Sequence, residues 1–172
     1  KITAASIQIQ ELDVFGICGS GIDFTGVYKH IDINSKKAEK LISMMAKTAH
    51  SNSLVKEKSG DFESALNYLS PFANSLLANS RIPITKDQKA KILNDYGYLY
   101  QQLGDDSRTI SILIKVLDEY PFRSVAHLNL ADSYWNVGSK DFAKIEYQKY
   151  VGLTRSKKTV PSRVFDRLKA LQ

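Results

Sequence analysis

Apolar residues recur at three- and four-residue steps through the carboxyl-terminal half of the chain. One such face runs from residue 92 to 103, another from 130 to 137 and a third from 143 to 151. This spacing places the apolar side chains on one side of a helix, whereas a half-buried strand would alternate them. Residues 110–117 are apolar nearly all round, which is typical of a helix packed between neighbours. The pattern therefore predicts a set of packed helices.

The predicted helices repeat with a period of 34 residues. Each repeat has a turn glycine, a tyrosine four positions before it and a small residue seven positions before it. Repeats of this length, with these three residues in this order, are typical of stacked helix-turn-helix units. The residues concerned are Gly97, Tyr100 and Gly104 in one unit, and Ala131, Tyr134 and Gly138 in the next.

These two units resemble the tetratricopeptide repeat (TPR) family, in which a small residue follows the turn glycine by five positions and a proline ends the second helix. The earlier unit ends at Pro121 but has Thr109 at the small position. The later unit has Ala143 at that position but ends at Arg155. Each unit departs from the family pattern once, and at a different place.

A third, degenerate unit precedes them. Gly60-Asp61-Phe62 and Ala65 match the turn and the second helix, and Ser53 is the small residue of the first helix. Lys56 stands where the aromatic residue is expected. Because its turn glycine lies 44 residues before the next one, we expect an insertion of about ten residues, most simply at 79–86.

The resemblance implies an all-α fold, a TPR-like solenoid of antiparallel helix pairs that covers residues 35–154. Residues 155–172 are expected to form a basic linker and a capping helix, which Pro161 opens at its first turn. Such a helix would cover the apolar end of the stack. Residues 1–34 lack the repeat pattern, and their apolar alternation followed by glycines predicts an irregular arm or short strands.

Composition and charge narrow the class of protein. The 172 residues, 43% hydrophobic and 24% charged, are ordinary for one soluble domain. No apolar run approaches the roughly 18 residues of a membrane span. Residues 155–172 carry +5 of the overall charge of +6, either as a solvated cap or as a dock for an acidic partner. Phe165 is the only aromatic residue among these charges in the sequence, so we do not expect nucleic-acid binding.

The start of the chain leaves its compartment open. Lys1 is the first residue, and we expect that no signal peptide remains in this sequence. A signal segment is lost on cleavage, so a periplasmic or otherwise exported protein and a cytoplasmic one are equally compatible with the sequence. One cysteine fits either compartment.

Residues with chemical potential do not form a recognisable catalytic or metal site. Cys18 could act as a nucleophile only with a histidine base, and none of the three histidines has a local signature. The glycine-rich segment 16–21 lacks the Lys-Ser/Thr of a phosphate loop. The histidines are also scattered without metal-ligand spacing. We therefore expect no enzymatic activity, no cofactor and no metal.

The resemblance implies a binding site instead, on the inner face of the first helix of each repeat. Positions three, six, ten and thirteen before the turn glycine line that groove in the family. Trp135 shares this face, whereas the adjacent Tyr134 points about 100° away and is expected to pack in the core. The predicted partner-binding residues are Lys91, Asn94, Tyr98 and Gln101 in one repeat and Val125, Leu128, Asp132 and Trp135 in the next, with Lys47, His50, Leu54 and Glu57 in the degenerate repeat.

Two functions fit these expectations. The first is an adaptor or scaffold that binds a segment of a partner protein, with aromatic residues flanked by polar ones. The alternative is a bacterial immunity protein that neutralises a toxin by binding it directly. The family's chaperone-tail binders clamp a terminal carboxylate with lysine and asparagine residues; Asn129 alone matches here, so we do not expect that specificity.

Overall fold

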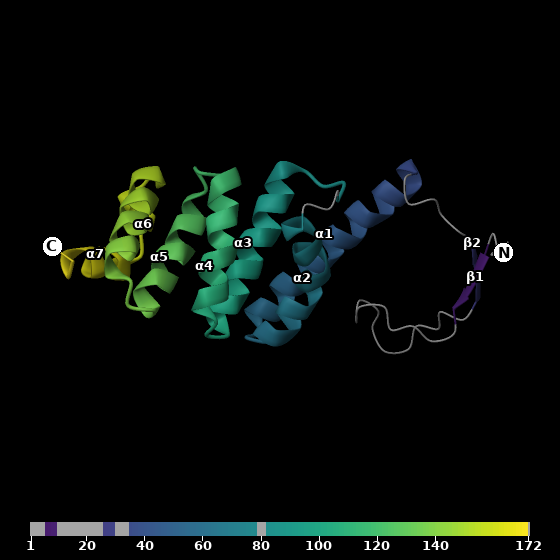
Figure 1. Ribbon diagram of the computed structural model, residues 1–172, viewed down its shortest axis with the longest axis horizontal. Coiled ribbons are helices and arrows are strands. Elements are labelled where there is room, and N and C mark those ends of the chain that lie inside the picture. Colours follow the sequence, from purple (N-terminus) through teal and green to yellow (C-terminus); the bar gives the residue numbers. More distant parts are fainter. Residues whose placement is uncertain (1–5, 10–25, 30–34, 79–81, 172) are drawn as a thin grey trace. The chain divides into compact units, whose positions relative to one another are not determined.

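The computed structural model describes residues 6–9, 26–29, 35–78 and 82–171, and the helices within them confirm the predicted helix-pair repeats (Figure 1). The chain divides into two compact units, residues 1–85 and 86–172, which are described separately below. Cys18, His30 and the glycine-rich segment 16–21 lie outside the described residues.

The described part of the first unit contains one antiparallel strand pair and one helix pair. Strands β1 (Ser6–Ile9) and β2 (Gly26–Lys29) pair antiparallel, with Ser6 opposite Lys29. Helix α1 (Lys36–Lys58) packs against α2 (Phe62–Leu77) through small and apolar side chains. These buried side chains include Ala46, Ala49, Ser53, Ala65 and Leu69.

The second unit is a run of five helices in which each packs against the next (Figure 1). They are α3 (Lys86–Gln102), α4 (Asp106–Glu119), α5 (Ser124–Asn136), α6 (Lys140–Leu153) and α7 (Ser162–Lys169), with a short 3₁₀ turn, η1 (Lys157–Thr159), before the last. Helix α3 also contacts α5. Pro121 follows the end of α4 and Pro161 is the N-cap of α7, because proline ends helices and suits their starts.

Three glycines end the first helix of each pair, at the positions that the repeat predicts. Gly60, Gly104 and Gly138 have φ of 78°, 82° and 80°. Each glycine N–H donates to the carbonyl three residues earlier, at 2.9–3.1 Å, and the next N–H donates to the carbonyl five residues earlier, at 2.9–3.0 Å. This pair of hydrogen bonds requires a residue in the left-handed conformation, which only glycine adopts without strain.

The turn geometry predicts opposite outcomes for one substitution at two positions. Gly138→Ala should lower the free energy of unfolding by about 1–2 kcal/mol, because an alanine is strained at this positive φ. Gly152→Ala, inside α6, should raise it by about 0.5 kcal/mol, since a Cβ there meets no atom within 4 Å. Urea denaturation of both variants tests this; equal effects would contradict the assigned turn.

Thr109, the departure from the small-residue pattern, is accommodated by a hydrogen bond. Its buried hydroxyl lies 2.9 Å from the carbonyl oxygen of Gly97 and 3.0 Å from that of Asp105. Gly97 lets α4 approach α3 closely, because a Cβ there would lie 3.0 Å from Cδ2 of Leu113. The two residues therefore fit as a pair: the glycine provides the space, and the threonine satisfies its carbonyl.

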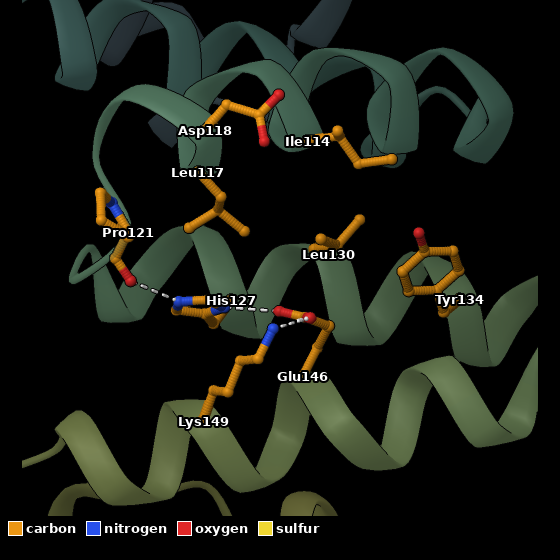
Figure 2. Close-up of a pocket in the computed structure, with 9 residues that line it drawn as sticks. All are labelled: Ile114, Leu117, Asp118, Pro121, His127, Leu130, Tyr134, Glu146 and Lys149. Atoms are coloured by element: carbon orange, nitrogen blue, oxygen red, sulfur yellow. Dashed lines mark hydrogen bonds and ion pairs between the residues drawn. The ribbon is translucent and has the colours of Figure 1, made fainter.

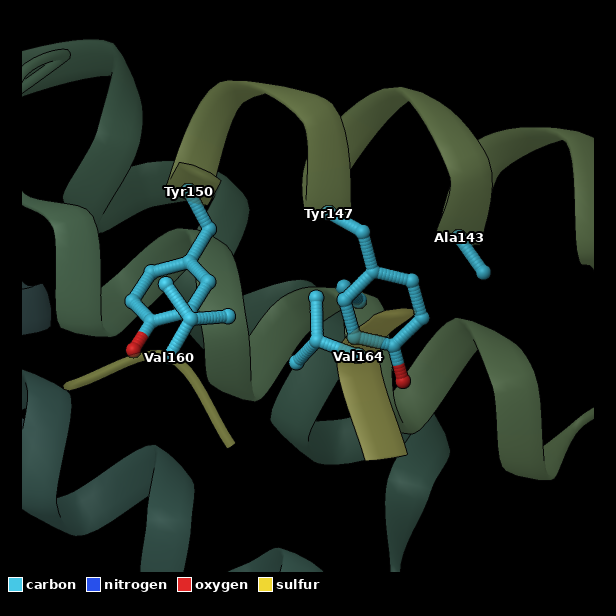
Figure 3. Close-up of a cluster of buried hydrophobic side chains, with 6 residues drawn as sticks. Ala143, Tyr147, Tyr150, Val160 and Val164 are labelled. Atoms are coloured by element: carbon cyan, nitrogen blue, oxygen red, sulfur yellow. The ribbon is translucent and has the colours of Figure 1, made fainter. Parts of the chain in front are cut away.

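Helix α7 covers the apolar side of the last helix pair, as predicted for a capping helix. Val164 is fully buried and Val160 nearly so, and both pack against Tyr147 and Tyr150 of α6 (Figure 3). Ala131 of α5 and Ala143 of α6 complete this buried cluster. The small residues of the repeat thus leave room for tyrosine rings that α7 closes over.

Candidate functional site

The candidate site is the face on which α3 and α5 lie next to each other. Gln101 of α3 fixes the spacing of the two helices: its Nε2 donates to the backbone oxygen of Asn129 at 2.8 Å and lies 2.7 Å from Oγ of Ser133. A side chain that bridges two helices in this way is held in one orientation. The face is therefore a preformed surface, with its other residues placed on either side of this bridge.

Asp132, one of the predicted binding residues, is the centre of a polar cluster with α6 and α7. Its carboxylate accepts from the Tyr147 hydroxyl at 2.6 Å, from Arg163 Nη2 at 2.7 Å and from Arg167 Nη1 at 2.6 Å. Burial, followed by the hydrogen bond to Asp132, raises the pKa of Tyr147, so this hydroxyl stays protonated as the donor. The hydrogen bond to Asp132 likewise raises the pKa of Arg163. Two of the carboxyl-terminal basic residues thus hold the cap in place.

Trp135 lies one helical turn from Asp132 and is half-buried. Its indole packs against the cluster under α7, and two cations lie over the ring: Lys140 Nζ at 3.4 Å and the Arg167 guanidinium at 5.0 Å from the centroid. Tyr134, expected in the core, is also half-buried and stacks on Phe142 with centroids 5.3 Å apart. Both aromatic residues therefore pack against their own chain while keeping part of their surface exposed.

The other predicted residues differ in how far they reach the surface. Lys91 is exposed and pairs with Asp87 at 2.7 Å, and Val125 is 48% exposed. Tyr98 and Leu128 are half-buried. Asn94 is buried; its amide donates to Asp95 at 3.0 Å, while Oδ1 has no hydrogen-bond partner among the described residues. The part of the face that a partner could reach is therefore formed chiefly by Lys91, Tyr98, Val125 and the open side of Trp135.

The corresponding residues of the degenerate repeat lie on α1, in the first unit. Lys47 and Leu54 are exposed, whereas His50 and Glu57 are half-buried. They share one side of that helix, as the spacing predicts.

A buried ionisable pair lies elsewhere in the second unit, and the sequence reasoning missed it. His127 Nδ1 lies 2.5 Å from Oε2 of Glu146, and His127 Nε2 lies 2.9 Å from the Pro121 carbonyl oxygen (Figure 2). Lys149 donates to the other oxygen of Glu146 at 2.7 Å. The repeat period contains the clue: 34 residues earlier, the same two positions hold Leu93 and Ile112, which are both buried.

Comparisons with known proteins identify the fold. No family model matches the chain, and no curated protein matches it by sequence. Among solved structures, the first TPR of Spaghetti (RPAP3), bound to the HSP90 peptide SRMEEVD, superimposes with a TM-score of 0.62 at 12% identity, over 75% of this chain and 94% of that one. The first TPR domain of human RPAP3 gives a TM-score of 0.58 at 11% identity, over 74% and 89%. The chain has a TPR-like fold. At these identities the likeness concerns the fold alone.

Within the described ranges, no helix combines the length and apolarity needed to cross a membrane. In the same ranges, no group of three or more His, Cys, Asp or Glu side chains is arranged to hold a metal ion.

Proposed function

We propose that the chain is a non-enzymatic protein-binding module that holds a segment of a partner protein on the α3–α5 face. The observation that carries this proposal is the arrangement of that face: exposed Val125 and half-buried Tyr98 and Trp135 stand beside the charged Lys91 on two helices that Gln101 fixes together. Aromatic and apolar anchors within a polar rim are typical of peptide receptors.

A TPR that resembles this chain was solved with an HSP90 peptide bound, which shows that such a fold can hold a peptide. The partner of this chain should differ in chemistry. Asn129, the one residue that matches a chaperone-tail clamp, is buried, and its backbone carbonyl is already bonded to Gln101. An internal segment with an apolar side chain therefore suits the face better than a terminal carboxylate.

Two valines at opposite ends of α5 provide the test. The full chain, immobilised, should retain a partner from its native host that mass spectrometry identifies, and Val125→Ala together with Tyr98→Ala should weaken the measured affinity at least about tenfold. Val137→Ala is the matched control, because Val137 is 46% exposed but lies outside the predicted set. Equal losses in the two variants, or none in either, would assign the partner to another surface.

A further inference from the structure

A groove lies between α4 and α6, outside the proposed binding face. It holds about 340 Å³ and is floored by α5 (Figure 2). Ile114 and Leu117 of α4, Leu130 and Tyr134 of α5, and Glu146 and Lys149 of α6 line it. A cavity of roughly 150 Å³ can hold a benzene ring, so this groove has room for an aromatic side chain.

Large apolar side chains are exposed around the groove. Ile114 is 41% exposed, and Phe142, which stacks on Tyr134, is 58% exposed. Ile145 lies on α6 one turn from Phe142 and is also exposed. The groove is therefore part of a wider apolar surface, of the kind that marks an interaction site.

An exposed aromatic residue is adjacent in sequence to the lining of this groove. Phe122 is 82% exposed, more than any other large apolar residue described, and it follows Pro121, which lines the groove. At this exposure the ring buries little of its surface against its own chain. The surface thus carries both a cavity for an aromatic ring and a ring next to it.

The charges beside these two features are complementary. Asp118, on the α4 wall, is exposed and has no ion pair among the described residues. Arg123 follows Phe122, is half-buried and has no ion pair among the described residues. The hydrogen bond from Lys91 and, more weakly, the charge of Arg123 lower the pKa of Asp87, and that carboxylate is already paired with Lys91 at 2.7 Å. The unpaired carboxylate of Asp118 and the guanidinium of Arg123, which has no ion pair among the described residues, could therefore pair across an interface.

We propose that the groove binds Phe122 of a second copy of this chain, in a two-fold symmetric dimer with Arg123 of each copy paired to Asp118 of the other. A residue and its receptor that lie side by side on one surface are what such an interface needs, because a two-fold axis between them places each ring in the opposite groove. This dimer does not rest on the proposed function and leaves the α3–α5 face unused.

Sedimentation velocity of the full chain from about 1 to about 100 µM, at ~0.15 M salt to screen its net positive charge, tests the proposal. The wild-type chain should form a reversible dimer, and Phe122→Ser should raise the dissociation constant at least about tenfold. Phe165→Ser is the matched control: Phe165 is 40% exposed on α7 and does not line the groove, so this variant should dimerise like the wild type.

An exchange of charges tests the pairing itself. Asp118→Lys and Arg123→Glu should each weaken the dimer, and the two together should restore it, because the pair is then reversed across the interface. A monomer at every concentration would overturn the proposal and leave the groove to another partner. So would association that continues beyond the dimer, or equal effects of Phe122→Ser and Phe165→Ser.

Discussion

Replacing Glu146 with alanine should lower the free energy of unfolding by about 2–4 kcal/mol. Its side chain is 10% exposed and that of His127 is 6% exposed, so the pair is removed from water. Without the carboxylate, His127 Nδ1 would be left buried with no partner among the described residues. Losing one member of a buried pair is costly because the other member has given up its hydration and gains nothing in return.

The repeat itself supplies the compensating variant. His127→Leu combined with Glu146→Ile copies Leu93 and Ile112, the buried residues at the same positions 34 residues earlier. An apolar pair of similar volume needs no desolvation of charge, so the double variant should be at least as stable as the wild type. Guanidinium denaturation of the single and double variants measures both effects. A double variant as unstable as Glu146→Ala would show that an apolar pair cannot replace His127 and Glu146 at these positions.

The turns and the close helix contacts could be predicted from the sequence, because each depends on one residue and its local geometry. Gly104 and Gly138 end their helices since a positive φ excludes other residues, and the period follows from them. Gly97 marks the close approach of α4, although the sequence did not show that the Thr109 hydroxyl would bond to its carbonyl. Spacing predicts where a residue lies, but not which atom it meets.

The surroundings of the predicted binding residues could not be obtained in the same way. Periodicity places Asp132 and Trp135 on one face of α5, as the structure shows. Asp132 bonds to Arg163 and Arg167, which lie 31 and 35 residues further along the chain. These contacts depend on how α7 docks. The basic charge of the last helix suggested either a solvated cap or a dock for an acidic partner. The sequence did not show that two of its arginines, Arg163 and Arg167, bind the chain's own Asp132.

Val164→Asp should lower the free energy of unfolding by about 3 kcal/mol or release α7 from the rest of the unit, because Val164 is fully buried against Tyr147 and Tyr150. Phe165→Asp is the matched control on the same helix. Phe165 is 40% exposed, so the same new charge there remains in water and should change stability by less than about 1 kcal/mol.

Release of α7 can be observed directly, because Trp135 is the only tryptophan in the chain. Arg167 of α7 lies over its indole ring, and undocking would expose that ring to water. The fluorescence of Val164→Asp should therefore shift to longer wavelength below its unfolding transition, while that of Phe165→Asp should not. An unshifted spectrum with unchanged stability would show that docking of α7 does not stabilise the rest of the unit.

The same variant also tests the proposed binding face. Undocking α7 would free the Asp132 carboxylate from Arg163 and Arg167 and uncover one side of Trp135. If a partner binds through these two residues, its affinity should rise in Val164→Asp, because α7 no longer competes for them. If it binds through Lys91, Tyr98 and Val125 of α3 and α5 instead, its affinity should be unchanged as long as these two helices remain folded. Titration of the identified partner against both aspartate variants separates the two parts of the face.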